Sequence, residues 1–395
     1  MVAGGTLATF LVAGAASLFM AWAIGAGSSG STPFAPAVGA NAISVMRAGF
    51  VVGLLGLGGA VLQGANVTEA VGRELVLNAT LSPTAAVVAL ITAAVLVAVG
   101  VFAGYPIATA FTVTGAVVGV GLALGGDPAW PKYREIVALW VATPFVGGGI
   151  AYATARGLRN EGVPESLAVP LLAGLVGAIL ANVRFVVLGP PDEAASLTGV
   201  ATTALSGLPS AVVYAGVTLV AATLAAVVLW WDLRGSPEAG QRHFLLALGG
   251  LVAFSAGGSQ VGLALGPLLP LLDPFEIPLV AVLLGGGLGL LIGSWTGAPR
   301  MIKALSQDYS ALGPRRSIAA LIPSFAIAQT AVFFGIPVSF NEIIVSAIIG
   351  SGFAAGGSGV SGRKMAYTVL AWIASLGLAL TLGYGVFTAI DVLPV

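Results

Sequence analysis

Apolar runs long enough to cross a lipid bilayer follow one another along almost the whole chain. A membrane-spanning helix needs about 20 apolar residues, because a rise of about 1.5 Å per residue must cover roughly 30 Å of hydrocarbon. The runs lie at residues 6–24, 43–63, 84–104, 107–124, 134–153, 168–188, 209–231, 244–256, 277–295, 318–334, 338–354 and 365–388. Only 8% of the 395 residues are charged, against about 25% in soluble domains. The sequence therefore predicts an all-α polytopic membrane protein with about 12 transmembrane segments.

The composition excludes several classes of protein. Fifteen Lys and Arg residues balance fifteen Asp and Glu residues, so the chain has no excess of basic charge with which to bind nucleic acid. It has no cysteine and one histidine, which excludes thiolate metal sites and cysteine nucleophiles and argues against haem. It also lacks the HExxH and GxSxG patterns of hydrolases. We therefore expect a protein of the lipid bilayer that is not an enzyme and holds no resident metal or cofactor.

Two of the apolar runs continue into long uncharged segments rich in Gly, Ser and Pro. These are residues 25–40 (GAGSSGSTPFAPAVGA) and residues 257–272 (GGSQVGLALGPLLPLL). Non-helical backbone at membrane depth is tolerated only where protein buries it or where it lines a water-filled cavity. We therefore predict broken or re-entrant helices at both places.

The charged loops predict the orientation in the membrane, because Lys and Arg concentrate in loops that face the cytoplasm. Basic residues occur in the loops at 155–165, 232–243, 298–317 and 355–364, whereas the charged residues of the loops at 189–208 and 272–276 are acidic. Alternation of the spans then places both termini outside. The chain is accordingly predicted to be a multi-pass protein of the cell membrane with an external N-terminus and an external C-terminus.

The beginning and the end of the chain follow the same order of predicted elements. In residues 1–155 and again in residues 244–395, a broken glycine-rich segment precedes a span, a polar loop, two spans joined by a tight turn at Pro106 or Pro337, and a final span. Two connecting spans in residues 156–243 invert the second copy relative to the first. Inverted repeats are typical of secondary transporters, whose site lies near the membrane midplane where broken helices meet.

Four short patterns within these repeats resemble those of the inorganic phosphate transporter (PiT) family. The family pattern GANDVANxxGP is similar to GGSQVGLALGP at 257–267 and, more loosely, to AGSSGST at 26–32. The family pattern PVSTTH, followed by VGAxxGxG, is similar to PVSFNE at 337–342 and PIATAF at 106–111, each followed by a glycine-containing run. The resemblance implies a homodimeric transporter of a tetrahedral inorganic oxyanion, either phosphate or sulfate.

The chain departs from the family at the paired Asn-Asp residues of the first pattern, which the family associates with sodium. It has Ser28-Ser29 and Ser259-Gln260 at those positions, and at Ser28, Ser29 and Gly30 it is similar to a sulfate-permease-like branch of the family. The resemblance therefore leaves both Na+ and H+ open as the driving ion, and both phosphate and sulfate open as the substrate.

An anion that leaves water must find hydrogen-bond donors fixed in the protein. Helix N-termini offer unpaired N–H groups, and neutral hydroxyl and amide side chains add further donors. Pro106 and Pro337 are each expected to begin a helix. The predicted substrate-binding residues lie in the two breaks and just after the two prolines: Ser28, Ser29, Thr109, Ser259, Gln260, Ser339 and Asn341. The competing interpretations are helix capping for the hydroxyls and close helix packing for the small residues.

Two carboxylates are candidates for coupling or gating. Glu342 is the only acid in residues 318–354, and a carboxylate inside a membrane is costly and by default functional, so Glu342 is predicted to carry the coupling proton. Its alternatives are a capping box with Ser339 and a role as a sodium ligand. Glu69 lies in the segment GANVTE, which is similar to a family pattern, and its alternative is a surface ion pair with Arg73.

These features together predict a secondary active symporter that moves the oxyanion by alternating access. The alternative is an anion channel, which needs a continuous pore, whereas two broken helices point to one occluded central site. Arg184, near the end of the run 168–188, is interpreted as extending to the lipid headgroups, with direct anion binding as its alternative.

Overall fold

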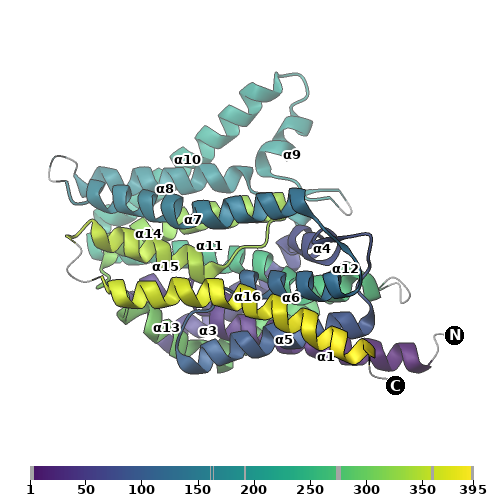
Figure 1. Ribbon diagram of the computed structural model, residues 1–395. Helices are drawn as coiled ribbons and strands as arrows, with labels where there is room; N and C mark the ends of the chain where they lie inside the picture. Colours follow the sequence, from purple (N-terminus) through teal and green to yellow (C-terminus); the bar gives the residue numbers. More distant parts are fainter. Residues whose placement is uncertain are drawn as a thin grey trace.

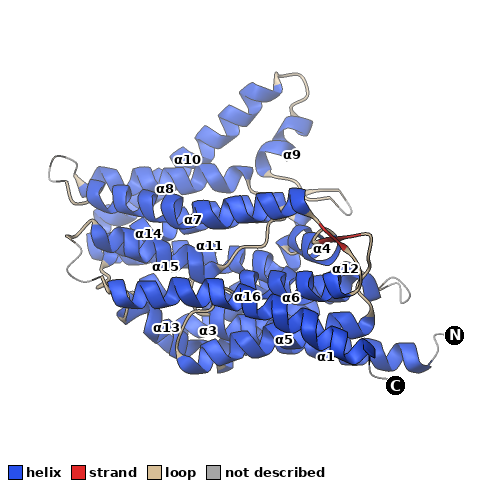
Figure 2. Cartoon of the chain, viewed as in Figure 1, coloured by secondary structure: helices blue, strands red, loops and turns tan. Residues whose placement is uncertain are grey.

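The structure, a computed structural model, is a bundle of helices. It describes residues 4–160, 162, 164–190, 193–272, 277–356 and 360–392. Within these ranges it contains sixteen α-helices, a few short helical turns of other types and one two-stranded β-ladder (Figure 2). The predicted all-α class is therefore confirmed.

Ten helices in the described ranges are long and apolar enough to cross a membrane. They are α1 (Gly4–Ile24), α3 (Val45–Gln63), α5 (Pro83–Ala103), α7 (Trp130–Gly157), α8 (Glu165–Asn182), α10 (Ser210–Gly235), α11 (Pro237–Leu265), α12 (Leu279–Thr296), α14 (Pro314–Phe334) and α16 (Gly362–Val392). The two remaining apolar runs form the shorter helices α6 (Thr109–Ala123) and α15 (Phe340–Phe353). These are about 21–23 Å long and cannot cross roughly 30 Å of hydrocarbon alone. The exact number of crossings stays a prediction.

The remaining elements are short connections at the ends of these helices. They are the π-helix η1 (Gly25–Ser29), α2 (Ala35–Gly39), α4 (Ala65–Arg73), the 3-10 helices η2 (Val186–Leu188) and η3 (Gly266–Leu271), α9 (Leu197–Ala204) and α13 (Ala298–Gln307). Strands β1 (Val76–Leu77) and β2 (Asp127–Pro128) pair antiparallel, with Val76 opposite Pro128. The ladder ties the α4–α5 connection to the α6–α7 connection.

Only one of the two predicted helix breaks has the predicted extent. After α1, residues 25–40 form η1, a turn and the five-residue helix α2, as expected of a broken segment. By contrast, α11 is one continuous helix through Leu265, so the break predicted at 257–272 is limited to η3. The glycines of this stretch bring helices together and do not end α11, since a Cβ at Gly257 would collide with the carbonyl oxygen of Gly56 on α3.

The series α1 to α7 and the series α11 to α16 contain corresponding elements. Helices α5 and α14 have 21 residues each, and both end at a glycine with positive φ, Gly104 at 74° and Gly335 at 60°. A short extended segment follows each glycine and leads into α6 or α15. The two series interlock, because α6 packs against α16 and α15 packs against α7. The boundaries 1–155, 156–243 and 244–395 and the inverted relation of the repeats stay predictions.

The basic loops and the chain ends lie at opposite ends of the bundle. Figure 1 shows the start of α1 and the end of α16 together, whereas the end of α7 and the starts of α8 and α16 lie at the other end. Arg156, Arg363 and Lys364 belong to that second end. The side of the membrane that each end faces stays a prediction. In the two acidic loops, Asp192 and residues 273–276 lie outside the described residues.

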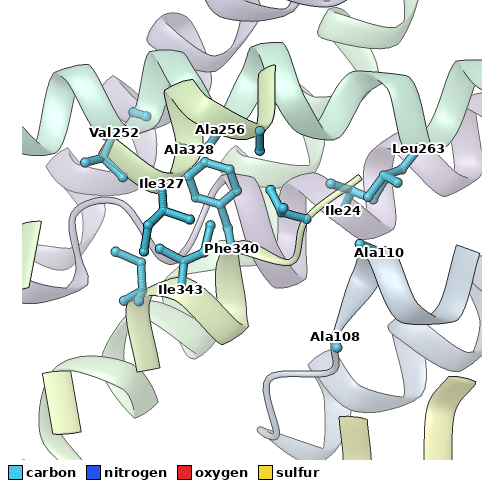
Figure 3. Packing of buried hydrophobic residues seen from close by; sticks show 14 of the residues in the cluster. Ile24, Ala108, Ala110, Val252, Ala256, Leu263, Ile327, Ala328, Phe340 and Ile343 are labelled. Carbon is cyan, nitrogen blue, oxygen red and sulfur yellow. The ribbon is translucent and has the colours of Figure 1, made fainter. Parts of the chain in front are cut away.

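The packed core lies where α11, α14 and α15 meet. Figure 3 shows Phe340 and Ile343, at the start of α15, close to Ile327 and Ala328 of α14. All four side chains are buried. By contrast, α10 projects from the bundle and exposes many apolar side chains, as expected of a surface that lies against lipid (Figure 1). This dense packing around the first turn of α15 fixes the position of that short helix.

Candidate substrate-binding site

Two extended segments carry the chain to the starts of α6 and α15 near the centre of the bundle. Each follows a helix that ends at a glycine of positive φ, and each contains a proline, Pro106 or Pro337. The prediction that these prolines begin the helices is wrong, because α6 begins at Thr109 and α15 begins at Phe340, three residues later. The backbone remains extended up to the residue before each helix, which is Ala108 in the case of α6.

Two tryptophans hold these extended segments in place. The indole N–H of Trp372 on α16 donates to the carbonyl of Pro106, and that of Trp140 on α7 donates to the carbonyl of Pro337, each at 2.8 Å. The indoles thus satisfy buried carbonyls that a helix starting at the prolines would have satisfied itself. Trp140 also stacks on Phe111 of α6, with ring centroids 3.8 Å apart. The sequence gives no sign of either contact, because the partners lie far apart in the chain.

Gln260 of α11 connects residues from both parts of the chain. Its amide oxygen accepts from the hydroxyls of Thr109 at 2.8 Å and Ser28 at 3.1 Å. Its amide nitrogen donates to the carbonyl of Val338 at 2.6 Å. All three side chains are fully buried. The structure therefore brings together three of the predicted residues, from η1, α6 and α11, and pairs the amide of Gln260 as its burial demands.

Asn341 forms a second link at the start of α15. Its amide nitrogen donates to the carbonyl of Gly27 at 2.9 Å and to the carbonyl of Ile107 at 2.6 Å. Because both partners are acceptors, the nitrogen and oxygen of this amide are assigned by the network. The amide oxygen is buried and has no partner among the described residues. Asn341 was predicted as a donor to the substrate, and in this conformation its free atom is an acceptor.

Five buried side-chain atoms have no hydrogen-bond partner in the described part of the chain. They are Oγ1 of Thr114, Oγ of Ser259, Oγ of Ser310, Oδ1 of Asn341 and Oε2 of Glu342. Proteins nearly always pair such atoms, since leaving one unpaired costs about 1–3 kcal/mol. Three of the five belong to residues that the sequence singled out. Unpaired atoms at Ser259, Asn341 and Glu342 are available to a polar ligand or an ion.

Ser29 and Ser339 lie beside this set. Ser29 is buried in the π-helix next to Ser28. The hydroxyl of Ser339, also buried, accepts from the backbone N–H of Glu342 at 3.5 Å, which is one half of the capping box considered for this pair. The reciprocal bond, from the N–H of Ser339 to the Glu342 carboxylate, does not occur in the described part of the chain. The capping interpretation therefore accounts for the serine and leaves the carboxylate unexplained.

Glu342 is 2% exposed and lies at the wall of a largely apolar groove between α7, α15 and α16. The groove has a volume of about 760 Å³, and its lining includes Trp140, Trp372, Ser346 and Thr368. Glu342 is thus an ionisable residue that directly follows Asn341 and borders this groove. A buried carboxylate of this kind is by default functional in a membrane protein.

Glu69 lies apart from this cluster. It is an exposed residue on α4, and its carboxylate forms an ion pair with Arg73 at 3.3 Å. About half of each side chain is exposed, 47% for Glu69 and 49% for Arg73, so water screens the pair and it contributes little to stability. The structure does not bring Glu69 to the site, and its gating role stays a prediction.

The arrangement can bind an anion without a fixed positive charge. The first turns of α6 and α15 present N–H groups that have no intrahelical acceptor, and the positive ends of both helix dipoles point towards the cluster. The hydroxyls of Ser28 and Thr109 now donate to Gln260, so an anion would replace these bonds with its own. The cluster is therefore closed in this conformation and is built from groups that can open towards a ligand.

The chain is similar to known transporters over nearly its whole length. A family model described as the phosphate transporter family matches residues 24–383. A protein of Thermococcus kodakarensis named as a candidate phosphate permease is 25% identical over 391 residues, with 91% of this chain and 92% of the relative covered. Inorganic phosphate transporter 2-1, chloroplastic, of Arabidopsis thaliana is 25% identical over 422 residues, with 92% of this chain and 69% of the relative covered.

A solved structure shows the same fold. It is that of a sodium-dependent phosphate transporter, and it matches 98% of this chain and 100% of its own chain with a TM-score of 0.81. The sequence identity is 21%, so the likeness shows a common architecture and no more.

Proposed function

This chain belongs to the phosphate transporter family, and we propose that it carries inorganic phosphate across the cell membrane as a secondary active symporter. The observation that supports the proposal is the meeting of Ser28, Thr109 and Gln260, fully buried and hydrogen bonded to one another, at the starts of two half-helices. The match of the family model to residues 24–383 confirms that the sequence motifs resemble those of this family.

The anion binds between the starts of α6 and α15. Hydroxyls of Ser28, Thr109, Ser259 and Ser339 rotate to donate to its oxygens, and the free N–H groups of both helices complete its coordination. The amide nitrogen of Gln260 now donates to Val338 and is the further donor available once that bond opens. Neutral donors are sufficient because a hydrogen bond is electrostatically stronger in the low-dielectric interior of the protein than in water.

Asn341 favours phosphate over sulfate. Near neutral pH, phosphate still carries hydrogen on oxygen, whereas sulfate carries none. The amide nitrogen of Asn341 is used by two backbone carbonyls, so its unpaired oxygen is available to accept from a P–OH group. A site with a buried acceptor rejects an analogue that lacks the matching donor, because the acceptor then stays unpaired. Sulfate is therefore the weaker competitor.

The co-transported cation binds at Glu342. The carboxylate follows Asn341 directly, and its Oε2 has no partner among the described residues. A cation there removes negative charge beside the incoming anion, so cation and anion each favour the binding of the other, which symport requires. A proton is the first candidate, because serines and a glutamine stand where the family has Asn-Asp pairs. Sodium is the alternative.

Alternating access supplies the transport step. The halves at 1–155 and 244–395 act as inverted repeats that move against each other around the closed cluster, and residues 156–243 connect them. A cluster whose donors bond one another and are fully buried favours this mechanism over an anion channel. The transporter is expected to be a homodimer with both termini outside, as the family resemblance and the charged loops imply.

Uptake by proteoliposomes tests the proposal. With an inward gradient of protons or of sodium imposed separately, labelled phosphate should accumulate above its external concentration under one of the two, and excess sulfate should inhibit weakly. Equilibration without accumulation under both gradients would indicate a channel. Accumulation of labelled sulfate in place of phosphate would show that sulfate is the substrate, with the same binding residues.

A further inference from the structure

A second cavity lies apart from the buried cluster, between the ends of α3, α8 and α14. Its volume is about 570 Å³. Its lining includes Gln63, Asn66, Arg184, Gln329, Thr330 and Phe333, and we name it the vestibule. Part of the connection between α8 and α9 also lines it, and Figure 1 shows α9 towards the end of the bundle where α1 begins. By the charge of the loops, this is the predicted outer end.

Arg184 supplies the positive charge of the vestibule. Its guanidinium carbon lies 4.7 Å from the centre of the Phe333 ring, and both residues line the vestibule. The ring orients the guanidinium without neutralising it. The amide of Gln63 donates to the backbone carbonyl of Arg184 at 2.9 Å, which fixes the position of the residue.

Arg184 is the only charged residue in the lining of the vestibule, as far as the structure describes it. The lining of the vestibule includes no Asp or Glu among the described residues, and Arg184 forms no ion pair with any of them. An unneutralised charge between low-dielectric walls attracts counter-ions and raises their local concentration. The planar guanidinium fork matches two oxygens of a tetrahedral oxyanion. The vestibule is therefore suited to phosphate and not to a cation.

A series of hydrogen-bonded side chains leads from the vestibule to Ser255 of α11, the helix that carries Gln260. Gln63 and Gln329 bond each other through both amides at 3.3 and 3.2 Å, and Gln329 donates to Ser255 of α11 at 2.6 Å. Ser255 lies one helical turn before Ser259, whose hydroxyl is buried and has no partner in the described part of the chain. Ser259 in turn is adjacent to Gln260. Polar groups thus continue from the outer cavity to the centre of the bundle.

We propose that the vestibule is a second anion site, in which Arg184 captures a phosphate oxyanion before it moves along the Gln329–Ser255–Ser259 line to the buried cluster. The inference rests on the proposed function. Capture at the outer end raises the rate at which substrate reaches the buried site and leaves the later steps unchanged. Loss of Arg184 should therefore raise the phosphate concentration for half-maximal uptake and preserve the maximal rate.

Uptake kinetics test this role. At low ionic strength, Arg184→Gln should raise the half-saturating phosphate concentration by about tenfold, because electrostatic capture contributes about this much or more to association. Arg184→Lys should keep part of the effect. The matched control is Arg134→Gln, an exposed arginine near the start of α7 that does not line the vestibule, and it should behave as the wild type. Salt should abolish the difference between wild type and Arg184→Gln.

Two different results would contradict phosphate transport and phosphate capture at Arg184. If the wild type takes up no phosphate at all, the proposed function is wrong. If the wild type transports phosphate and Arg184→Gln has the same half-saturating concentration at low salt, the vestibule is not a capture site.

Cysteine labelling tests binding directly, because the chain has no cysteine of its own. Thr330→Cys places one exposed thiol in the vestibule lining. Inorganic phosphate should slow its reaction with a membrane-impermeant maleimide, and Arg184→Gln should remove that protection. Protection should persist when Gln260→Leu disables the buried cluster. Loss of protection in Gln260→Leu would show that phosphate acts only through the buried site.

A lipid headgroup offers the same phosphate chemistry, so the labelling is repeated in a phospholipid-free detergent. Inorganic phosphate alone should protect the thiol there. Protection by added phosphatidylglycerol but not by inorganic phosphate would make the vestibule a headgroup site and overturn the capture role.

Discussion

The starts of α6 and α15 share a backbone and differ in side chains. Each follows a glycine of positive φ and an extended proline segment, and in each an indole from the other series of helices donates to the proline carbonyl at 2.8 Å. The first helical residues are Thr-Ala-Phe in α6 and Phe-Asn-Glu in α15. One half-helix thus contributes a hydroxyl, whereas the other contributes an amide and a carboxylate. The two helix starts can therefore bind an anion from two sides, whereas only the start of α15 carries a group that can bind a cation.

The largest difference between the two half-helices should be seen at Glu342. Glu342→Gln keeps the size of the side chain and removes the charge that binds the cation. Gradient-driven accumulation of labelled phosphate should fall by about tenfold or more, because the anion no longer gains affinity from the cation. Exchange of phosphate across the membrane without a gradient should persist.

Glu135→Gln is the control for this change, since Glu135 is an exposed acid in an ion pair with Lys132 on α7. It should accumulate phosphate as the wild type does. Accumulation by Glu342→Gln with the wild-type dependence on pH and on sodium would show that Glu342 does not bind the driving ion.

Gln260 joins the two half-helices, and its removal should break the site from both sides. Gln260→Leu removes the bonds to Thr109, Ser28 and Val338 and leaves a buried carbonyl unpaired. Phosphate affinity, measured by calorimetry or by phosphate-dependent thermal stabilisation, should fall by about 2–3 kcal/mol. Gln307→Leu, at the exposed end of α13, is the matched control. Equal phosphate affinity in both variants would place the site elsewhere.

Asn341 should separate the two substrates. Asn341→Leu removes the acceptor proposed for the P–OH group, so phosphate binding should weaken by about 1–3 kcal/mol while sulfate binding changes less. Thr109→Val removes a hydroxyl that both anions would use and should weaken both to a similar degree. Competition between labelled phosphate and unlabelled sulfate measures the ratio. An unchanged ratio in Asn341→Leu would mean that the asparagine oxygen does not recognise phosphate.

Substitution of either tryptophan should have the smallest effect, and the two substitutions should lower stability by similar amounts. Trp140→Phe and Trp372→Phe each remove one N–H donor from a buried proline carbonyl and keep most of the ring. Each should lower the unfolding free energy by about 1 kcal/mol, read as a lower melting temperature in detergent. Similar shifts support equivalent frames in the two series. A large shift for one variant only would show that the frames are not equivalent.

Much of the site could be predicted from the sequence because its signals are local. Gly, Ser and Pro in an apolar run indicate a break, which predicts Ser28 and Gln260 as site residues. A proline before an apolar run indicates a helix start nearby, which predicts Thr109. The same signals misplaced the break at 257–272, because glycine also serves close helix packing and the helix continues to Leu265.

Other features depend on contacts between distant parts of the chain. Trp140 and Trp372 each reach a proline carbonyl in the other series, and Gln63 pairs with Gln329 across 266 positions. The helix starts at Thr109 and Phe340 follow from those contacts as well, since the indoles hold the prolines in extended backbone. No local pattern identifies such partners, so only the folded chain shows them.

The position of a bound oxyanion is the most direct test of a substrate site between α6 and α15. A crystal structure with arsenate, a tetrahedral analogue of phosphate, locates the ion by its anomalous scattering. We expect a peak between the starts of α6 and α15, within hydrogen-bonding distance of Thr109 and Ser339, with a weaker peak at Arg184. A peak found only at Arg184, or at neither place while transport is inhibited by arsenate, would contradict a substrate site between these two helices.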